Sequence, residues 1–444
     1  MNGAPDQMLA HDLIRDDLEI IDLLRNTTYT SIEINNYTQY LKHSIYEKFN
    51  GNTLNKIIFI DTNEFFIVVC AMKAVWELGA SIFLNDVDPK VKFLPYFKNF
   101  YNVIDLVIGL ERDTKWVTPE KYIFVDGYDS QSRILCKDFA YGAPNITPET
   151  VAYYTTSSGT TDDPKILSFT HYQTVTISAS IHQYLDIKET DRPYHYKTLH
   201  HSSLFNSFAL PMMTTCKTHY CGLFQKNPND FLTKILDIAK NKQANYFLLP
   251  YSWIRNFKSV PSVDLKNLVT FITIQGNTTD EMKDLFDRFA PRQVINYFGC
   301  SEIGTMFISR TTATNLDEYN PNRFHDITPY IDYKILTNTV ECKWKHINDW
   351  TVLADKMHKE QDNSIWHYGR EVAFTINNQT LILYDLNQLI EKEIGTSQFI
   401  TVPDYKLQLL YLAVFNENLS VDGLARLNMK IQQQFSPIFF ISDV

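Results

Sequence analysis

Residues Tyr153–Lys165 read YYTTSSGTTDDPK, and the rest of the chain is best interpreted from this stretch. Every residue from Thr155 to Thr161 is hydroxylic or glycine. Phosphate oxygens need several short hydrogen-bond donors close together, and hydroxyl and loop N–H groups supply them. Gly159 lacks a Cβ atom, so the backbone can approach an anion closely. The stretch predicts a phosphate-binding loop; the alternative is a solvated loop rich in serine and threonine.

Strands and helices alternate on both sides of this loop. The apolar runs that we expect to be buried strands are 57–60, 81–84, 103–108, 246–249, 269–274 and 294–297. The segment between the first two is typical of a helix that stops at Gly79. Such alternation predicts mostly parallel sheets, in which ligands bind beyond the carboxyl ends of the strands.

The pattern changes toward the end of the chain. It becomes strand-rich from Tyr330, and a strand, a turn, a strand and a helix follow Gly369–Arg370. We therefore expect an α/β fold with two domains and a hinge at residues 369–370. Residues 1–368 would form a large N-terminal domain of mostly parallel sheets with flanking helices and a strand-rich, barrel-like part. Residues 369–444 would form a small C-terminal α+β domain.

Charge and composition exclude several classes of partner. The net charge of −10 opposes binding to nucleic acid phosphates. No stretch approaches the roughly 18 apolar residues that a membrane helix needs, and the N-terminus lacks the pattern of a signal peptide. The six cysteines form no C-x-x-C pair, which favours free thiols over a zinc site. We expect a cytoplasmic protein with no nucleic acid or membrane partner.

The segment Ser157–Lys165 resembles the ATP phosphate loop of the adenylate-forming superfamily. This superfamily includes acyl- and aryl-CoA synthetases, luciferases and the adenylation domains of peptide synthetases. The resemblance implies that Lys165 is catalytic. The ATP- and AMP-binding residues that it implies are Ser157, Ser158, Gly159, Thr160, Thr161, Gly276, Phe298, Gly299, Asp355 and Arg370.

Further motifs of the superfamily follow in the expected order. Phe298–Glu302, FGCSE, is similar to the family's Tyr-Gly-x-Thr-Glu and follows a predicted strand. By resemblance, Ser301 helps to hold phosphate and Glu302 binds Mg²⁺, a role that suits a carboxylate. Asp355 stands 15 residues before Arg370, as in the family pair that reaches the ribose. In isolation, that pair would be read as a salt bridge or as two surface charges.

The acid substrate is expected near a second group of residues. The resemblance implies that the acid pocket includes His200, His201, Phe205, Gly276 and Cys300. Amino-acid-activating relatives usually carry Phe-Asp where this chain has Phe205-Asn206, and asparagine has no charge to pair with an α-ammonium group. An aryl or acyl acid is therefore favoured.

The sequence departs from the family at two places. Asp162 stands where the ATP loop usually has its second glycine, and Asp163 follows it. Relatives carry a catalytic lysine near the C-terminus, whereas the last lysine here is Lys430. The tail FSPIFFISDV resembles the strand before the family's catalytic lysine, so we expect the segment with this lysine to be absent, by nature or by truncation, and activity to be weak.

Two functions are predicted from these observations. The first is an acid:thiol ligase that uses ATP and Mg²⁺ to activate a small carboxylic acid as acyl-AMP. It would release pyrophosphate and pass the acyl group to coenzyme A or to the phosphopantetheine of a carrier protein. The alternative is a degenerate relative that binds a nucleotide or acyl-adenylate without efficient catalysis, as a scaffold or regulator.

Overall fold

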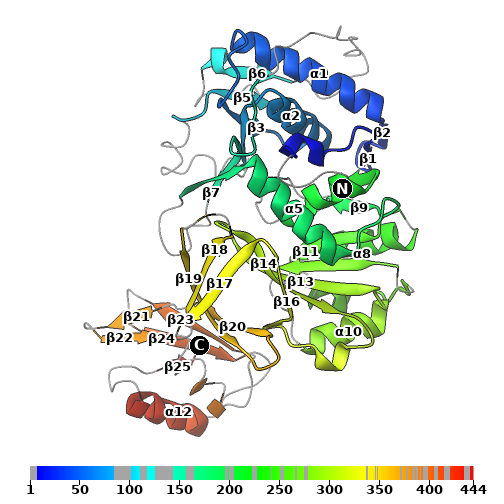
Figure 1. Cartoon of the computed structure of the whole chain (residues 1–444). Coiled ribbons are helices and arrows are strands. Elements are labelled where there is room, and N and C mark those ends of the chain that lie inside the picture. Colours follow the sequence, from blue (N-terminus) through cyan, green and yellow to red (C-terminus); the bar gives the residue numbers. More distant parts are fainter. Residues whose placement is uncertain are drawn as a thin grey trace. The chain divides into compact units, whose positions relative to one another are not determined.

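The structure is a computed structural model of the 444-residue chain. It describes residues 8–84, 102–110, 118–125, 144–156, 165–195, 199, 205–222, 228–241, 243–250, 255–265, 268–274, 279–336, 339–345, 347, 349–370, 373–376, 379–382, 386, 389–390, 392–393, 399–404, 409–414, 421–434 and 441–443. The chain forms two compact units (Figure 1): unit 1 is Met1–Asp332 with Lys343–Asn348, and unit 2 is Tyr333–Cys342 with Asp349–Val444. The hinge expected at residues 369–370 falls within unit 2 and stays a prediction.

Unit 1 contains a six-stranded sheet in the order β6-β5-β3-β4-β7-β8. Its strands are β3 (Ile57–Asp61), β4 (Ser81–Leu84), β5 (Leu106–Gly109), β6 (Tyr122–Phe124), β7 (Val151–Thr156) and β8 (Ile166–Thr170). Neighbouring strands are parallel except β7 and β8, which are antiparallel. Helix α2 (Phe65–Glu77) connects β3 to β4 and is buried almost all round because its sequence is nearly all apolar. As predicted, it stops at Gly79, whose φ of 70° is left-handed.

A second sheet of unit 1 has nine strands in the order β16-β14-β13-β12-β11-β9-β10-β1-β2. Its strands are β1 (Glu19–Asp22), β2 (Thr27–Tyr29), β9 (Pro193–His195), β10 (Thr218–Cys221), β11 (Tyr246–Pro250), β12 (Thr270–Ile274), β13 (Gln293–Cys300), β14 (Gly304–Thr311) and β16 (Asp326–Ile327). The six strands from β1 to β13 in this order are parallel, and β2, β14 and β16 are antiparallel to their neighbours. The predicted α/β class with mostly parallel sheets is confirmed.

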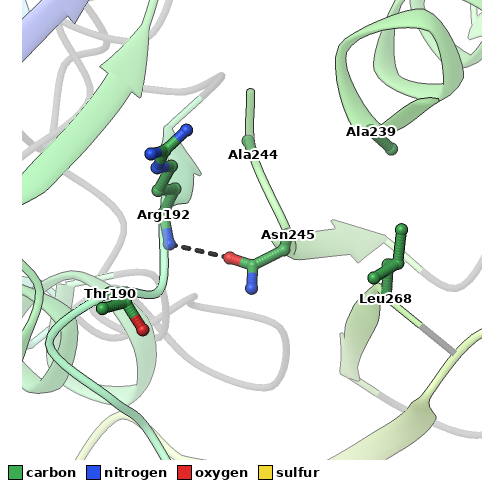
Figure 2. Close-up of a pocket in the computed structure, with 6 residues that line it drawn as sticks. All are labelled: Thr190, Arg192, Ala239, Ala244, Asn245 and Leu268. Atoms are coloured by element: carbon green, nitrogen blue, oxygen red, sulfur yellow. Dashed lines mark hydrogen bonds between the residues drawn. The ribbon is translucent and has the colours of Figure 1, made fainter. Parts of the chain in front are cut away.

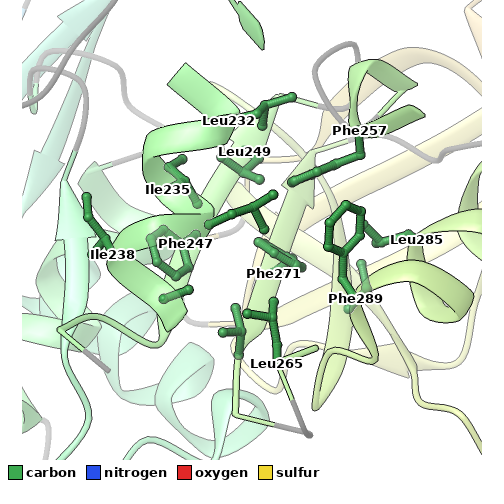
Figure 3. Close-up of a cluster of buried hydrophobic side chains, with 14 of the residues drawn as sticks. Leu232, Ile235, Ile238, Phe247, Leu249, Phe257, Leu265, Phe271, Leu285 and Phe289 are labelled. Carbon is green, nitrogen blue, oxygen red and sulfur yellow. The ribbon is translucent and has the colours of Figure 1, made fainter. Parts of the chain in front are cut away.

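Helices α8 (Pro228–Lys240) and α10 (Thr279–Phe289) bury their apolar faces on this sheet (Figure 3). Leu232, Ile235 and Ile238 of α8 and Leu285 and Phe289 of α10 are each at most 5% exposed. These side chains meet aromatic residues of β11 and β12. Successive residues of a strand point to opposite faces of the sheet, so only some residues of each strand face the helices. The cluster makes the strands a rigid base for the loops at their carboxyl ends.

Further helical segments of unit 1 lie before or between its strands in the chain. They are η1 (Ala10–Leu13), α1 (Ser31–Lys48), η3 (Pro119–Lys121), α5 (His171–Leu185), the π-helical turn η5 (Phe205–Ala209), α7 (Leu210–Thr215), η6 (Arg255–Ser259) and η7 (Leu316–Glu318). Helix α5 contacts β7 and β8 of the first sheet and β14 of the second, and so joins them. A short strand, β15 (Arg323–Phe324), lies between η7 and β16 in the chain. No helix in the described residues is long and apolar enough to span a bilayer.

Unit 2 is strand-rich, as the sequence predicts. Strands β17 (Ile331–Leu336) and β18 (Thr339–Trp344) carry the boundary between the units, and β19 (Thr351–Lys359) and β20 (Ile365–Arg370) form an antiparallel hairpin beside β18. A hairpin of β21 (Ala373–Ile376) and β22 (Gln379–Ile382) follows. The last elements are β23 (Phe399–Asp404), β24 (Leu409–Val414), α12 (Val421–Gln434) and β25 (Ile441–Asp443), whose strands form one sheet.

Candidate nucleotide site

The phosphate-loop stretch connects β7 to β8, which form an antiparallel hairpin. Thr156 pairs with Ile166, so the strands enclose the loop at the carboxyl end of β7, the edge where ligands of parallel sheets bind. Lys165 is an exposed residue directly before β8. The loop residues Ser157, Ser158, Gly159, Thr160 and Thr161 lie outside the described residues, so their predicted roles stay predictions.

Buried contacts fix the base of this hairpin. Tyr153 of β7 stacks on Phe169 of β8, with ring centroids 4.7 Å apart and planes at 5°. The indole Nε1–H of Trp76, in α2, donates to the carbonyl of Ala152 over 2.8 Å. Burial raises the pKa of Tyr153 well above its usual range, so its hydroxyl stays a neutral hydrogen-bonding group. The two strands therefore position the loop on a base that is already ordered.

The Phe298–Glu302 motif forms a second hairpin, between β13 and β14. Cys300 pairs with Gly304, which places Ser301 and Glu302 in the connecting turn. Both are half-buried, as is Cys300. Phe298 is 8% exposed, and its ring stacks on that of Phe307 in β14.

Two glycines allow this tight turn. A Cβ atom at Gly299 would lie 2.2 Å from the carbonyl oxygen of Gly304, closer than any side chain can approach. Gly304 itself has φ of 92°, which favours glycine. The register of the two strands also shifts between Phe298 and Gly299. The motif is thus a bulged hairpin that presents a hydroxyl and a carboxylate beyond the carboxyl end of a parallel strand.

Glu302 suits a magnesium ion that arrives with its own phosphate oxygens. Mg²⁺ is usually held by one or two carboxylates together with substrate phosphates. Among the described residues no group of three or more His, Cys, Asp or Glu side chains could hold a metal alone. A single carboxylate is a donor set that fits Mg²⁺ brought by ATP.

Residues of the predicted acid pocket lie beside these hairpins. Phe205 is fully buried and meets the ring of Tyr153 edge-on, with centroids 5.1 Å apart. It begins the π-helical turn η5, an irregularity common at functional sites. The hydroxyl of Ser207, in the same turn, lies 2.5 Å from the hydroxyl of Thr305 in β14. His200, His201 and Gly276 lie outside the described residues.

Asn206 contacts Tyr153, a link that the sequence does not reveal. Its side-chain amide donates to the Tyr153 hydroxyl, although 53 residues separate the two. Asn206 is 2% exposed, and its Oδ1 is buried without a partner among the described residues. The turn, the phosphate-loop hairpin and β14 are therefore connected by buried side chains.

The two predicted ribose residues meet in unit 2. Asp355 of β19 and Arg370 of β20 are direct partners in the antiparallel register. Asp355 is 5% exposed, and its Oδ1 lies 2.9 Å from Nε2 of His367, also on β20. No sequence motif marks His367 as a site residue, although it stands three residues before Arg370.

Two cavities elsewhere in unit 1 do not match these positions. The cavity in Figure 2, of about 350 Å³, is lined by Thr190, Arg192, Ala239, Ala244, Asn245 and Leu268. Arg192 and Asn245 directly precede β9 and β11, so this cavity lies at the amino ends of the strands, away from the edge where ligands bind. A cavity of about 680 Å³ is lined by Pro148, Glu149, Thr170, Tyr172, Gln173, Trp344 and Ile347. Thr170 ends β8, at the opposite end from the phosphate loop.

Solved structures of adenylate-forming enzymes share the fold of the whole chain. ATP-bound MatB from Rhodopseudomonas palustris matches with a TM-score of 0.75 and 12% identity, over 98% of this chain and 95% of that one. The adenylation domain of a keto acid-selecting peptide-synthetase module, bound to a keto acyl adenylate, matches with a TM-score of 0.74 and 13% identity. This match covers 98% of this chain and 92% of that one. The anthranilate CoA ligase AuaEII, in complex with anthranoyl-AMP, matches with a TM-score of 0.69 and 13% identity, over 99% of this chain and 94% of that one.

Sequence comparison gives the same assignment. The chain is 22% identical over 297 residues to the bassianolide nonribosomal cyclodepsipeptide synthetase of Beauveria bassiana. The match covers 66% of this chain and 9% of that much longer protein. The AMP-binding enzyme family matches residues 82–340, more than half of the chain and a range that includes both hairpins. The chain therefore belongs to the AMP-binding enzyme family, within the adenylate-forming superfamily.

Proposed function

We propose that this chain activates a carboxylic acid with ATP, forming acyl-AMP and releasing pyrophosphate. The observation that carries the proposal is the β13–β14 hairpin, which presents Ser301 and Glu302 beyond the carboxyl end of a parallel strand. A hydroxyl and a carboxylate at such an edge suit a phosphate chain and its magnesium ion. Membership of the AMP-binding enzyme family supports the same reaction.

The reaction divides among the residues as follows. A carboxylate oxygen of the acid attacks the α-phosphorus of ATP, and the bond from that phosphorus to the pyrophosphate oxygen breaks. Ser301, Lys165 and the loop residues 157–161 bind the phosphates, and Asp355 and Arg370 bind the ribose. Mg²⁺ held by Glu302 would neutralise phosphate charge, which is the main demand of phosphoryl chemistry. Phe298 and Gly299 would border the adenine.

We further propose an aryl or acyl acid rather than an α-amino acid. Asn206 carries no charge, and its amide donates to Tyr153, so it offers no carboxylate to an α-ammonium group. The rings of Phe205, Tyr153 and Trp76 pack around the same turn. These rings are fully buried, and an apolar environment of this kind beside the pocket suits an apolar acid. His200, His201, Gly276 and Cys300 would complete the pocket.

Pyrophosphate release with a panel of acids tests the activation step. The panel should contain an aryl acid, a fatty acid, a keto acid and several α-amino acids. We expect release with an aryl or acyl acid and none with the amino acids. Glu302→Ala should abolish release while the chain stays folded, and Glu318→Ala, which removes an exposed glutamate, should not. Near-normal rates in Glu302→Ala would show that Glu302 is not the magnesium ligand.

The acyl group would next pass to a thiol of coenzyme A or of a carrier-protein phosphopantetheine. Attack of the thiol on the acyl carbon would form a thioester and release AMP. We place the reaction in the cytoplasm, which supplies ATP and reduced thiols. Thioester formation with each acceptor, followed by mass spectrometry, separates the two. Release of pyrophosphate without any thioester would restrict the function to activation.

Asp162 and Asp163 favour a second function, binding without turnover. Two carboxylates beside a polyphosphate repel it unless they face solvent or contact the metal. A binding protein would take up ATP in calorimetry and release no pyrophosphate with any acid. Robust turnover would exclude this alternative.

A further inference from the structure

Strand β20 carries one residue more than β19 in the middle of their hairpin. Lys356 pairs with Gly369, but the next residue of β19, Met357, pairs with His367, so Tyr368 is the additional residue. A shift of one residue in register moves a side chain to the other face of a sheet. Bulges re-aim side chains in this way, often beside functional sites. This bulge puts His367 on the same face as Met357.

Asp355 lies on that same face, because it stands two residues before Met357 on β19. It is therefore a diagonal cross-strand neighbour of His367, at a separation that a long side chain can bridge. The 2.9 Å contact between His367 Nε2 and Asp355 Oδ1 bridges it. Regular pairing would instead place His367 opposite His358, on the face away from the carboxylate.

A second irregularity occurs at Asp355 on the β18 side. Thr339 pairs with Lys356, but the next residue of β18, Val340, pairs with Leu353. Ala354 and Asp355 are thus skipped in this register, and the strand is irregular at the carboxylate on both sides. Two irregularities therefore meet at one nearly buried acid, and such irregularities often occur beside functional sites.

We propose that His367 is the positioning residue for Asp355 in nucleotide binding. The inference rests on the proposed function, in which Asp355 accepts the ribose hydroxyls. With side-chain exposures of 7% for Asp355 and 19% for His367, the pair is largely shielded from water. A carboxylate has about four acceptor positions, so a bond from His367 fixes its orientation without exhausting them. A carboxylate that is already oriented loses less entropy when the ribose binds.

Calorimetry with ATP and with 2′,3′-dideoxy-ATP, each with Mg²⁺, tests this role in the full chain. Only ATP carries the hydroxyls that Asp355 would bind. His367→Phe keeps a ring but removes the donor, and His367→Gln keeps an N–H near the position of Nε2. His358→Phe is the matched control, because His358 is on the same hairpin with a side chain 52% exposed.

We expect His367→Phe to weaken ATP binding about tenfold, because an Asp355 carboxylate that is no longer held must be ordered when the ribose binds, and to leave the dideoxy nucleotide unaffected. His367→Gln and His358→Phe should retain the wild-type preference for ATP. In an Asp355→Asn background, His367→Phe should weaken ATP binding no further.

Several results would overturn the inference. One is an equal loss of affinity for both nucleotides in His367→Phe, and another is an unchanged preference of that variant for ATP. The others are additive losses of ATP affinity when His367→Phe is combined with Asp355→Asn, and a wild-type chain that binds the two nucleotides equally well. The proposed reaction fails separately. A chain that prefers ATP through His367 but releases no pyrophosphate refutes the reaction alone, whereas pyrophosphate release with an unchanged preference in His367→Phe refutes the inference alone.

Discussion

Acidification should unfold unit 1 through three buried histidines. His171, His195 and His219 are at most 5% exposed. Burial lowers the pKa of His171 to about 4, with a contribution from His11, and that of His219 to about 3. Burial and the neighbouring His219 also hold the pKa of His195 well below its usual range. His195 Nε2 and His219 Nδ1 are 2.8 Å apart, a contact that requires at least one ring to be neutral.

The sign follows from the lowered folded-state pKa values. In the unfolded chain each imidazole has a pKa of about 6.5, so below that pH the unfolded state binds protons that the folded state does not. The stabilisation is present above pH 6.5 and is lost as the pH falls toward the folded-state values. Each group contributes about 1.4 kcal/mol per pH unit, or about 2 kcal/mol at pH 5. Three groups give about 6 kcal/mol, comparable to the whole stability of many domains.

Urea unfolding between pH 7 and pH 5, followed by tryptophan fluorescence, to which the buried Trp76 contributes, measures this loss. His171→Asn keeps an acceptor for the Ala10 N–H, which now donates to Nδ1 over 2.9 Å, but removes one titrating group. It should lower the slope of stability against pH by about one third. His358→Asn, at an exposed position, should leave the slope unchanged. A flat profile in the wild type, or equal effects of the two substitutions, would refute the reasoning.

Two further predictions concern the candidate site. Gly299→Ala would force a methyl group against the Gly304 carbonyl, so we expect a loss of about 1–3 kcal/mol from overpacking, read as a lower urea midpoint; an unchanged midpoint would mean that the hairpin opens without cost. Arg370→Ala should weaken ATP binding by about 1–3 kcal/mol, the value of a hydrogen bond between charged groups, and an unchanged dissociation constant would remove Arg370 from the nucleotide.

The parts of the site that could be predicted are those written in consecutive residues. Strand β13 covers the predicted strand 294–297, but it continues through the first three residues of the Phe298–Glu302 motif, so only Ser301 and Glu302 of that motif lie in the turn. Elsewhere in the chain, the hairpin of β21 and β22 confirms the two strands expected after Gly369–Arg370. Local patterns suffice here because strand propensity and turn chemistry act over a few residues.

Contacts across long separations could not be predicted. The bond between Asn206 and Tyr153 depends on the packing of a π-helical turn against another sheet. The contact of His367 with Asp355 depends on a single additional residue in β20, and no residue type marks that bulge in advance. In both cases the side chains are ordinary and the backbone register decides whether they meet.

The same distinction explains how the fold persists at 12% identity to MatB. A core such as that around Phe247 and Phe271 requires apolar side chains of suitable volume, and many combinations satisfy that requirement. The hairpin tip is different, because no side chain fits at Gly299. Divergence in function is therefore best sought at positions that alter chemistry while the backbone stays in place. Asn206 and His367 are such positions, because each is a polar side chain in contact with another residue of the candidate site, Tyr153 in one case and Asp355 in the other.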